Sequence, residues 1–300
     1  MFEGSPTRAA PRTVLDVVSP LLGVAAVWLV VAIAPLSACG GPTAQSPSAA
    51  PIDELPAATT TAARSASTSD DAALDRGAAY LAGTFDKIDA VSLAIIDYVG
   101  RRFGLEQLAT ARSEAERRYP NEVMADDLAL QRLVIGGSPP PTDLSAASPT
   151  TRLLATALHC DRRLPGQDYP DQLRSALQQG GFEATHAALA LGWLRELGCS
   201  GPELSELSDE ADRALRSGFD GGSEVVDLRV EQAAFREYLT SQPIDDAAWI
   251  DALRAAQRPD GGWGQNGPSS ESSWHTTVLA MWDLAAATTR SEPIAMIASA

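Results

Sequence analysis

The sequence predicts an all-α domain built from stacked helical hairpins. Apolar residues recur at helical spacing, with one stripe formed by Leu74, Ala78 and Leu81 and others within 91–99 and 153–158. Alternation typical of β-strands is hard to find. Short connections rich in Gly and Pro separate the periodic segments, and helices of about three or four turns joined in this way pack as antiparallel hairpins.

The same periodicity predicts the later helices in chain order. They are expected over 170–179, 183–198, 202–217, 224–240, 246–257 and 274–288. Breakers lie between them at 164–166, 180–181, 200–202, 221–222 and 259–262. From residue 71 onward the chain has about 230 residues, which is enough for one large helical domain. We therefore expect a single helical domain over 71–300.

The first 38 residues have the pattern of a secretory signal. Two arginines precede the apolar run 21–34, and the sequence Leu-Ser-Ala-Cys follows and ends at Cys39. This tetrapeptide resembles the lipobox of bacterial lipoproteins, in which a peptidase cleaves before a cysteine that already carries diacylglycerol. The resemblance implies a signal peptide over 1–38 and fatty acylation (palmitate) of Cys39. The alternative is a retained transmembrane helix over 17–38, which is nearly long enough to span a bilayer.

The next segment, 39–70, is predicted to be a disordered tether. It consists mainly of Ala, Ser, Thr, Pro and Gly and contains almost no large apolar residue. Such a segment cannot bury enough surface to offset the entropy of ordering. We expect it to let the helical domain stand away from the lipid headgroups, on the extracytoplasmic side of either the inner or the outer membrane.

The charge of the chain excludes one class of partner. The formal net charge is −16, and because the charges of the signal segment cancel, the exported part keeps all of it. Phosphates of nucleic acids and anionic headgroups would repel so acidic a domain. Nucleic acid is therefore not expected as a partner, and contact with the membrane is expected through the lipid on Cys39.

The remaining cysteines suggest a disulfide. Lipidation of Cys39 would leave Cys160 and Cys199, an even pair in an oxidising compartment. Closing a loop of that size would contribute roughly 3–4 kcal/mol. The alternative is two buried thiols that act as small hydrophobes, because sequence alone does not place their Cβ atoms.

Two of the predicted helices share a pattern of side chains. Each carries a histidine in its first turn and a tryptophan two turns later on the same stripe. The two sets are His186, Leu189, Ala190, Trp193 and His275, Val278, Leu279, Trp282. Repeated hairpins that bury a shared face are expected in helical solenoids and closed helical rings.

A further motif lies in 249–264, where Gln257 is followed by Asp-Gly-Gly-Trp-Gly at 260–264. It resembles the Gln…Gly-x-Trp repeat of the squalene cyclase and prenyltransferase group, and the similarity continues through 274–277. A weaker similarity to the first helix of such a repeat lies in 75–81. Because that group folds as an α/α toroid, the resemblance implies a small or incomplete toroid with both histidines on inner helices.

The catalytic signatures of that group are not carried over. Class II cyclases use an Asp-x-Asp-Asp acid, and the nearest segments here, 123–127 and 243–246, lack the first aspartate. Protein prenyltransferases bind zinc through Asp-x-Cys and a later histidine. His275 is similar to that histidine, but leucine stands two residues before both Cys160 and Cys199. We therefore expect no cofactor.

Two histidines remain the candidates for chemistry, His186 and His275. Glu183 precedes His186 by three residues on one helix face, and Asp89 begins another apolar helix. Two histidines with carboxylates can hold a divalent metal ion or serve as acid and base. These four residues are therefore the candidate catalytic set, and the two histidines are candidate metal ligands. The alternative is that each histidine ends a core stripe and bonds a backbone carbonyl.

Two functions remain open. The leading hypothesis is a membrane-anchored lipoprotein that binds a small molecule, glycan or protein in a concave helical site without catalysis, because the catalytic acids are absent. The alternative is a cell-envelope enzyme acting on a polysaccharide or an isoprenoid, which requires the candidate side chains to converge on one cavity. The tryptophans of the last third of the chain either form platforms for sugars or fill seams between helices.

Overall fold

A computed structural model describes residues 68–122, 124–199, 201–219, 224–242, 246–288 and 297. The predicted signal segment, Cys39 and all but the last three residues of the 39–70 tether lie outside the described residues. Within the described residues there are eleven α-helices, three short 3-10 helices and one two-stranded ladder. The prediction of an all-α fold is confirmed.

The elements follow one another with short connections. The helices are α1 (Thr68–Ala82), α2 (Ala90–Phe103), α3 (Thr110–Arg118), α4 (Ala125–Ala129), α5 (Pro149–Leu158), α6 (Tyr169–Gln179), α7 (Gly181–Glu196), α8 (Pro202–Phe219), α9 (Asp227–Thr240), α10 (Ala247–Ala256) and α11 (Trp274–Thr288). The short 3-10 helices are η1 (Glu106–Leu108), η2 (Tyr119–Asn121) and η3 (Gln131–Leu133). Strands β1 (Trp263–Gly264) and β2 (Ser272–Ser273) pair antiparallel between α10 and α11.

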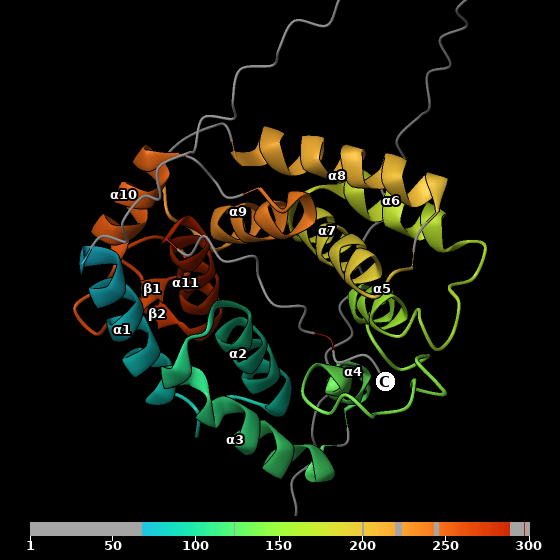
Figure 1. The fold of residues 1–300 in the computed structure, drawn as a ribbon, viewed down its shortest axis with the longest axis horizontal. Coiled ribbons are helices and arrows are strands. Elements are labelled where there is room, and N and C mark those ends of the chain that lie inside the picture. The colour runs from blue at the N-terminus through green and yellow to red at the C-terminus, as the bar shows by residue number, and fades with distance from the viewer. Residues whose placement is uncertain are drawn as a thin grey trace, which may run out of the picture. The chain divides into compact units, whose positions relative to one another are not determined.

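The helices form two rows. In the inner row α2, α11, α9, α7 and α5 are neighbours in that order, and α1, α3, α6, α8 and α10 pack on their outer side (Figure 1). Most outer helices are thus joined to an inner helix that is next to them in the chain, as expected of stacked hairpins. The first described helix, α1, packs against the last, α11.

Aromatic side chains fill the space between α2, α9 and α11. Trp282, which is 2% exposed, meets the rings of Phe103 and Tyr238 edge-on at centroid distances of 5.7 Å. Arg102 lies over the Trp282 ring at 5.0 Å and pairs with Glu237 at 3.3 Å. Glu237 also accepts a hydrogen bond from the Trp282 indole at 2.8 Å. These inner helices therefore enclose a packed aromatic core that contains a buried Arg–Glu ion pair.

The Gln-Gly-Trp segment ties the last hairpin to the first helix. Trp263 is fully buried and donates from its indole nitrogen to the carbonyl of Leu253 at 2.8 Å. The Gln257 amide donates to the carbonyls of Ala73 in α1 and Gly261, at 2.8 and 2.9 Å. Gly261 has φ of 92° and lies against the backbone of α1, where a side chain would collide.

A disulfide joins Cys160 and Cys199, as one of the two sequence interpretations predicted. Their Cα atoms are 6.2 Å apart, and 39 positions separate them in the sequence. Cys160 follows α5 and Cys199 follows α7, so the bond connects the C-terminal ends of two neighbouring inner helices.

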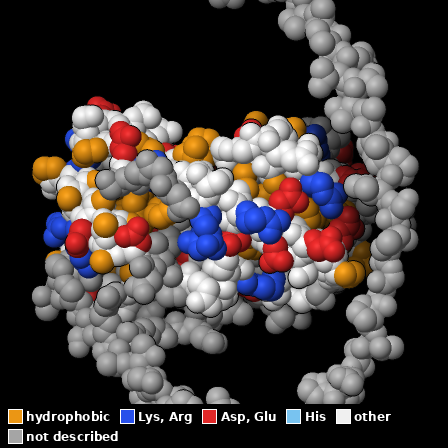
Figure 2. Space-filling view, turned by 90° about the horizontal axis from the view of Figure 1, so that it is seen from above, with side chains coloured by type: hydrophobic (Ala, Val, Ile, Leu, Met, Phe, Trp, Pro, Cys, Tyr) orange, Lys and Arg blue, Asp and Glu red, His pale blue; other side chains and the backbone are white. Residues whose placement is uncertain are grey.

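The surface carries charges of both signs. Figure 2 shows Asp and Glu side chains interspersed with Arg and Lys side chains on one face. Several acids of the helical domain pair with arginines along a helix, for example Glu114 with Arg118 at 2.6 Å and Asp212 with Arg216 at 2.7 Å. Across the described helices, none is both long enough and apolar enough to cross a membrane.

Candidate functional site

The strongest cluster of titratable side chains lies at the N-terminal ends of three inner helices. His186 belongs to the second turn of α7, and His275 is the second residue of α11. Asp227 begins α9, and Glu231 follows one turn later. Because α7 and α11 both pack against α9, their histidines come to lie on either side of the α9 carboxylates.

Asp227 orients the imidazole of His275. The Nδ1 atom of His275 lies 3.0 and 3.2 Å from the two carboxylate oxygens, and the Thr276 hydroxyl donates to the same carboxylate at 2.6 Å. Burial raises the pKa of Asp227, but the hydrogen bonds from His275 and Thr276 outweigh it and hold that pKa below its usual value. Burial lowers the pKa of His275, but Asp227 and the charge of Glu231 outweigh it and raise that pKa.

Glu231 is the central acid of the cluster and is fully buried. Its Oε1 atom accepts from the hydroxyl of Thr185 and lies 3.7 Å from Nδ1 of His186. Its Oε2 atom has no hydrogen-bond partner among the described residues and lies 3.7 Å from Nε2 of His275. Burial raises the pKa of Glu231, and the neighbouring histidines only partly oppose this effect.

Solvent reaches the cluster from the side of the histidines. The side chain of His186 is 27% exposed and that of His275 is 29% exposed, in contrast to the buried carboxylates. Nδ1 of His186 donates to the carbonyl of Phe182, whose own side chain is 41% exposed. Trp274 meets the His275 ring edge-on at 5.4 Å. One aromatic side chain, that of Trp274, thus adjoins the cluster through His275.

Two of the four predicted site residues come together, and two do not. His186 and His275 face opposite oxygens of one carboxylate, Glu231. Glu183, however, is exposed, and the carboxylate that faces His186 comes from α9 instead. Asp89 is exposed and is the N-cap of α2, where its side chain accepts a hydrogen bond from the backbone N–H of Ser92 at 2.7 Å. Its carboxylate therefore caps α2 and is not part of the cluster. The alternative prediction, that a histidine bonds a backbone carbonyl, is met by Nδ1 of His186, which bonds the carbonyl of Phe182.

Sequence reasoning missed Asp227, Glu231, Thr185 and Thr276. One signal was present: Asp227 and Glu231 are spaced four apart on a helix whose neighbouring positions, such as Val230 and Ala234, are apolar and buried. Charged residues on the apolar face of a helix are seldom buried without a partner. That spacing would have indicated an acidic pair directed at the core.

The cluster has the composition of a metal site. Within the described part of the chain, Asp227, Glu231 and His275 each offer one ligand atom, and these atoms lie within 4.8 Å of one another. His186 lies next to this group. Carboxylate oxygens and imidazole nitrogens are common ligands of divalent metals and are also the usual groups of acid–base catalysis.

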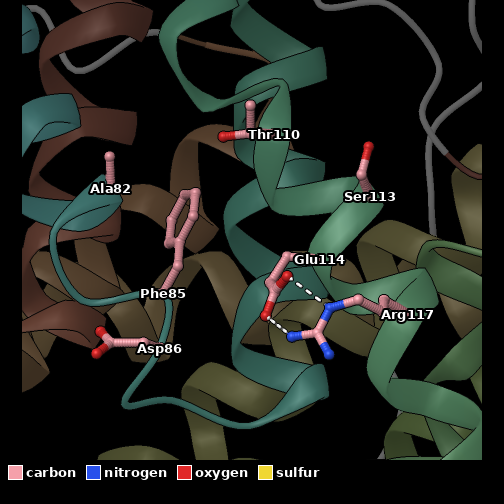
Figure 3. Close-up of a pocket in the computed structure, with 7 residues that line it drawn as sticks. All are labelled: Ala82, Phe85, Asp86, Thr110, Ser113, Glu114 and Arg117. Carbon is pink, nitrogen blue, oxygen red and sulfur yellow. Dashed lines mark hydrogen bonds and ion pairs between the residues drawn. The ribbon is translucent and has the colours of Figure 1, made fainter.

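Two surface cavities lie elsewhere. The first, between the end of α1 and α3, is lined by Phe85, Glu114 and Arg117, and Figure 3 shows the last two paired with each other. The second, of about 310 Å³, lies between the loop before α5 and the start of α6 and includes His159 and Arg163. Burial and the charges of two nearby arginines lower the pKa of His159 to about 4. Neither cavity is lined by the residues of the His186–Glu231–His275 cluster.

The tryptophans occupy seams between helices, as the second interpretation of them expected. Trp193, Trp249, Trp263 and Trp282 are all at most 3% exposed. Among the five tryptophans from Trp193 onward, only Trp274 is half-buried, and it contacts His275. Stacking of a sugar needs an accessible ring face, so these four buried rings offer no platform for a glycan.

Comparison with protein-family models, with curated proteins and with solved structures gave no match to this chain.

Proposed function

We propose that this protein is held at the extracytoplasmic face of a membrane by lipid on Cys39 and that its helical domain binds a cation. One observation carries the second part: Glu231 and Asp227 are 0% and 6% exposed, yet among the described residues no Lys or Arg pairs with either. Their neighbours are two imidazoles and two hydroxyls. Burying two carboxylates without a permanently charged Lys or Arg partner is costly, and a bound cation would offset that cost.

The anchoring proposal rests on the first 39 residues. A basic and then apolar segment ends in the Leu-Ser-Ala-Cys sequence, which resembles a lipobox. The Cys160–Cys199 disulfide supports export, because such bonds persist in oxidising compartments. We further propose that the two rows of helices belong to a small α/α toroid, since α1 packs against α11 and the Gln257 segment links them.

Binding without catalysis is the leading proposal, and a cell-envelope enzyme is the second candidate. The enzyme is favoured by one observation: both imidazoles flank the carboxylate of Glu231, where they could exchange protons with a substrate from the solvent side. A polysaccharide or an isoprenoid remains the proposed substrate class of that candidate. Turnover of either by purified protein, abolished in His275→Ala, would replace the binding proposal by the enzyme.

Cation binding is tested by calorimetric titration of the full chain in detergent micelles after treatment with a chelator. The titrants are Zn²⁺, Ca²⁺, Mg²⁺ and tetramethylammonium. At least one should bind at a ratio of one per chain, and Glu231→Gln should abolish that binding. Glu183→Gln is the matched control, because it makes the same charge change at an exposed position of α7. Absence of binding by all four titrants would contradict the proposal.

Anchoring is tested separately in cells of a bacterial host that processes lipoproteins. Radiolabelled palmitate should enter the wild-type chain and should not enter Cys39→Ala, which should also leave the detergent phase on partitioning. Equal labelling and equal partitioning of the two proteins would refute acylation at Cys39.

A further inference from the structure

We propose that the bound cation is a divalent first-row transition metal ion of the zinc type, held by Oε2 of Glu231 and Nε2 of His275. In this site Asp227 orients His275, and His186 borders the metal on the other side of the Glu231 carboxylate. The inference rests on the cation-binding function proposed above and adds the chemical class of the ion and the atoms that hold it.

The hydrogen bonds of the two histidines leave their Nε2 atoms free to bind a metal. Nδ1 of His275 faces the Asp227 carboxylate, which accepts hydrogen bonds and cannot donate when it is ionised. That nitrogen therefore carries the proton, and in the neutral ring Nε2 keeps its lone pair. The same reasoning applies to His186, whose Nδ1 faces the carbonyl of Phe182. A carboxylate that holds the far nitrogen of a histidine is the usual support for a metal-binding imidazole.

When Glu231 is ionised and His275 is neutral, the atoms that face each other across the site are both acceptors. Nε2 of neutral His275 and Oε2 of Glu231 lie 3.7 Å apart, which is too long for a hydrogen bond, and Oε2 has no other partner among the described residues. Two ligands that each lie about 2.1 Å from a tetrahedral zinc ion are separated by about 3.4 Å. The observed gap is thus close to the spacing of two ligands on one metal ion.

The charge and the types of ligand indicate the class of ion. Two buried carboxylates match the charge of a divalent cation, and the ligand atoms of Asp227, Glu231 and His275 lie within 4.8 Å of one another. Ca²⁺ and Mg²⁺ prefer sites built wholly from oxygen, whereas imidazole nitrogen favours zinc, iron, cobalt and nickel. An imidazole opposite the key carboxylate oxygen therefore favours a transition metal.

The site is open on one side. The histidine side chains are 27% and 29% exposed, whereas Glu231 is fully buried. Structural metal sites are closed by four protein ligands, whereas open sites keep a water in a free position. We expect the metal here to retain at least one exchangeable water.

The test uses the full chain in detergent micelles, stripped with a chelator and titrated with Zn²⁺, Co²⁺, Ca²⁺ and Mg²⁺. We expect one Zn²⁺ per chain, bound at least about 100-fold more tightly than Ca²⁺ or Mg²⁺. Co²⁺ should give a visible absorption band that Zn²⁺ abolishes by displacement. Glu231→Gln and His275→Gln should each weaken Zn²⁺ binding at least about 100-fold, and Asp227→Asn should weaken it about 10- to 100-fold, as expected of a residue that orients a ligand.

Two controls separate ligand loss from unfolding. Glu183→Gln should bind Zn²⁺ like the wild type, and circular dichroism without metal reports whether each variant is folded. Should one variant unfold, the other ligand variant and the Co²⁺ spectrum of the wild-type chain still decide the question.

The possible outcomes distinguish this inference from the function on which it rests. Binding of Ca²⁺, Mg²⁺ or tetramethylammonium that depends on Glu231, with Zn²⁺ no tighter, would overturn the zinc-type site and leave cation binding intact. Zn²⁺ binding that survives both Glu231→Gln and His275→Gln would show an adventitious site elsewhere and overturn the inference. Absence of any cation binding would contradict both proposals.

Discussion

Removing the Cys160–Cys199 disulfide is expected to lower the free energy of unfolding by about 4 kcal/mol. The bond joins residues separated by 39 positions. In the chain-entropy relation, closing a loop of about 40 residues removes about 13 cal/mol/K from the unfolded chain, which is about 4 kcal/mol at 25 °C. Cys160 is fully buried in the core, so its reduced thiol keeps its packing and the loss comes mainly from the unfolded state.

Urea unfolding followed by circular dichroism measures this effect. With a slope of about 2 kcal/mol per molar urea, a reductant should shift the midpoint of the wild-type chain down by about 2 M. The double variant Cys160→Ala/Cys199→Ala should unfold near the reduced midpoint and should not respond to the reductant. If a thiol assay shows complete reduction while the wild-type midpoint moves by less than about 0.3 M, the loop-entropy reasoning is refuted.

Three further predictions concern the core and its titration. Trp282→Ala should lower the free energy of unfolding by about 3–5 kcal/mol, because it removes a ring that is buried against Phe103 and Tyr238. A loss below about 1 kcal/mol in a urea titration would contradict the packed core. Gly192→Ala should lower the free energy of unfolding by about 1–3 kcal/mol, because the added methyl group would collide with the Tyr238 ring. A thermal midpoint equal to that of the wild type would show that the ring moves away freely. His159 is 4% exposed, and its pKa is lowered to about 4 in the folded chain. Because the unfolded chain binds the proton at a higher pH, the free energy of unfolding should fall by up to about 3 kcal/mol as the pH drops from about 6.5 toward 4. His159→Gln should flatten that part of the pH profile, and identical profiles for the two proteins would refute the assignment.

The helices could be predicted from the sequence wherever an apolar stripe runs between two breakers. The prediction for 274–288 coincides with α11, and that for 170–179 differs from α6 by one residue. The start of α9 was placed three residues too early, because periodicity does not reveal that Val226 is still extended and acts as its N-cap. The segment 106–133 was not assigned, since its helices are short and few of their residues are buried.

The site could be predicted only in part, because spacing along one helix says nothing about a neighbouring helix. Periodicity found His186 and His275 at equivalent positions of two helices, and both positions meet one carboxylate. Spacing along the helix predicted Glu183 as the acidic partner of His186, because Glu183 lies three residues before it on the same helix face. The actual partner, Glu231, comes from α9, which packs between the two histidine helices, and that packing depends on tertiary contacts.

The buried position of Glu231 leaves few ways to satisfy its free oxygen. The side chain is 0% exposed and its other oxygen is held by Thr185, so rotation toward water would break that bond and open the core. Two turns after His275, Trp282 packs against aromatic side chains of α9 and so holds α11 against α9. This packing keeps His275 opposite Glu231. The free oxygen of Glu231 can gain a partner from a cation, a proton or a water molecule that enters from the exposed side of the histidines. The same residues that stabilise the inner helices therefore also hold His275 and Glu231 in place, as the proposed cation site requires.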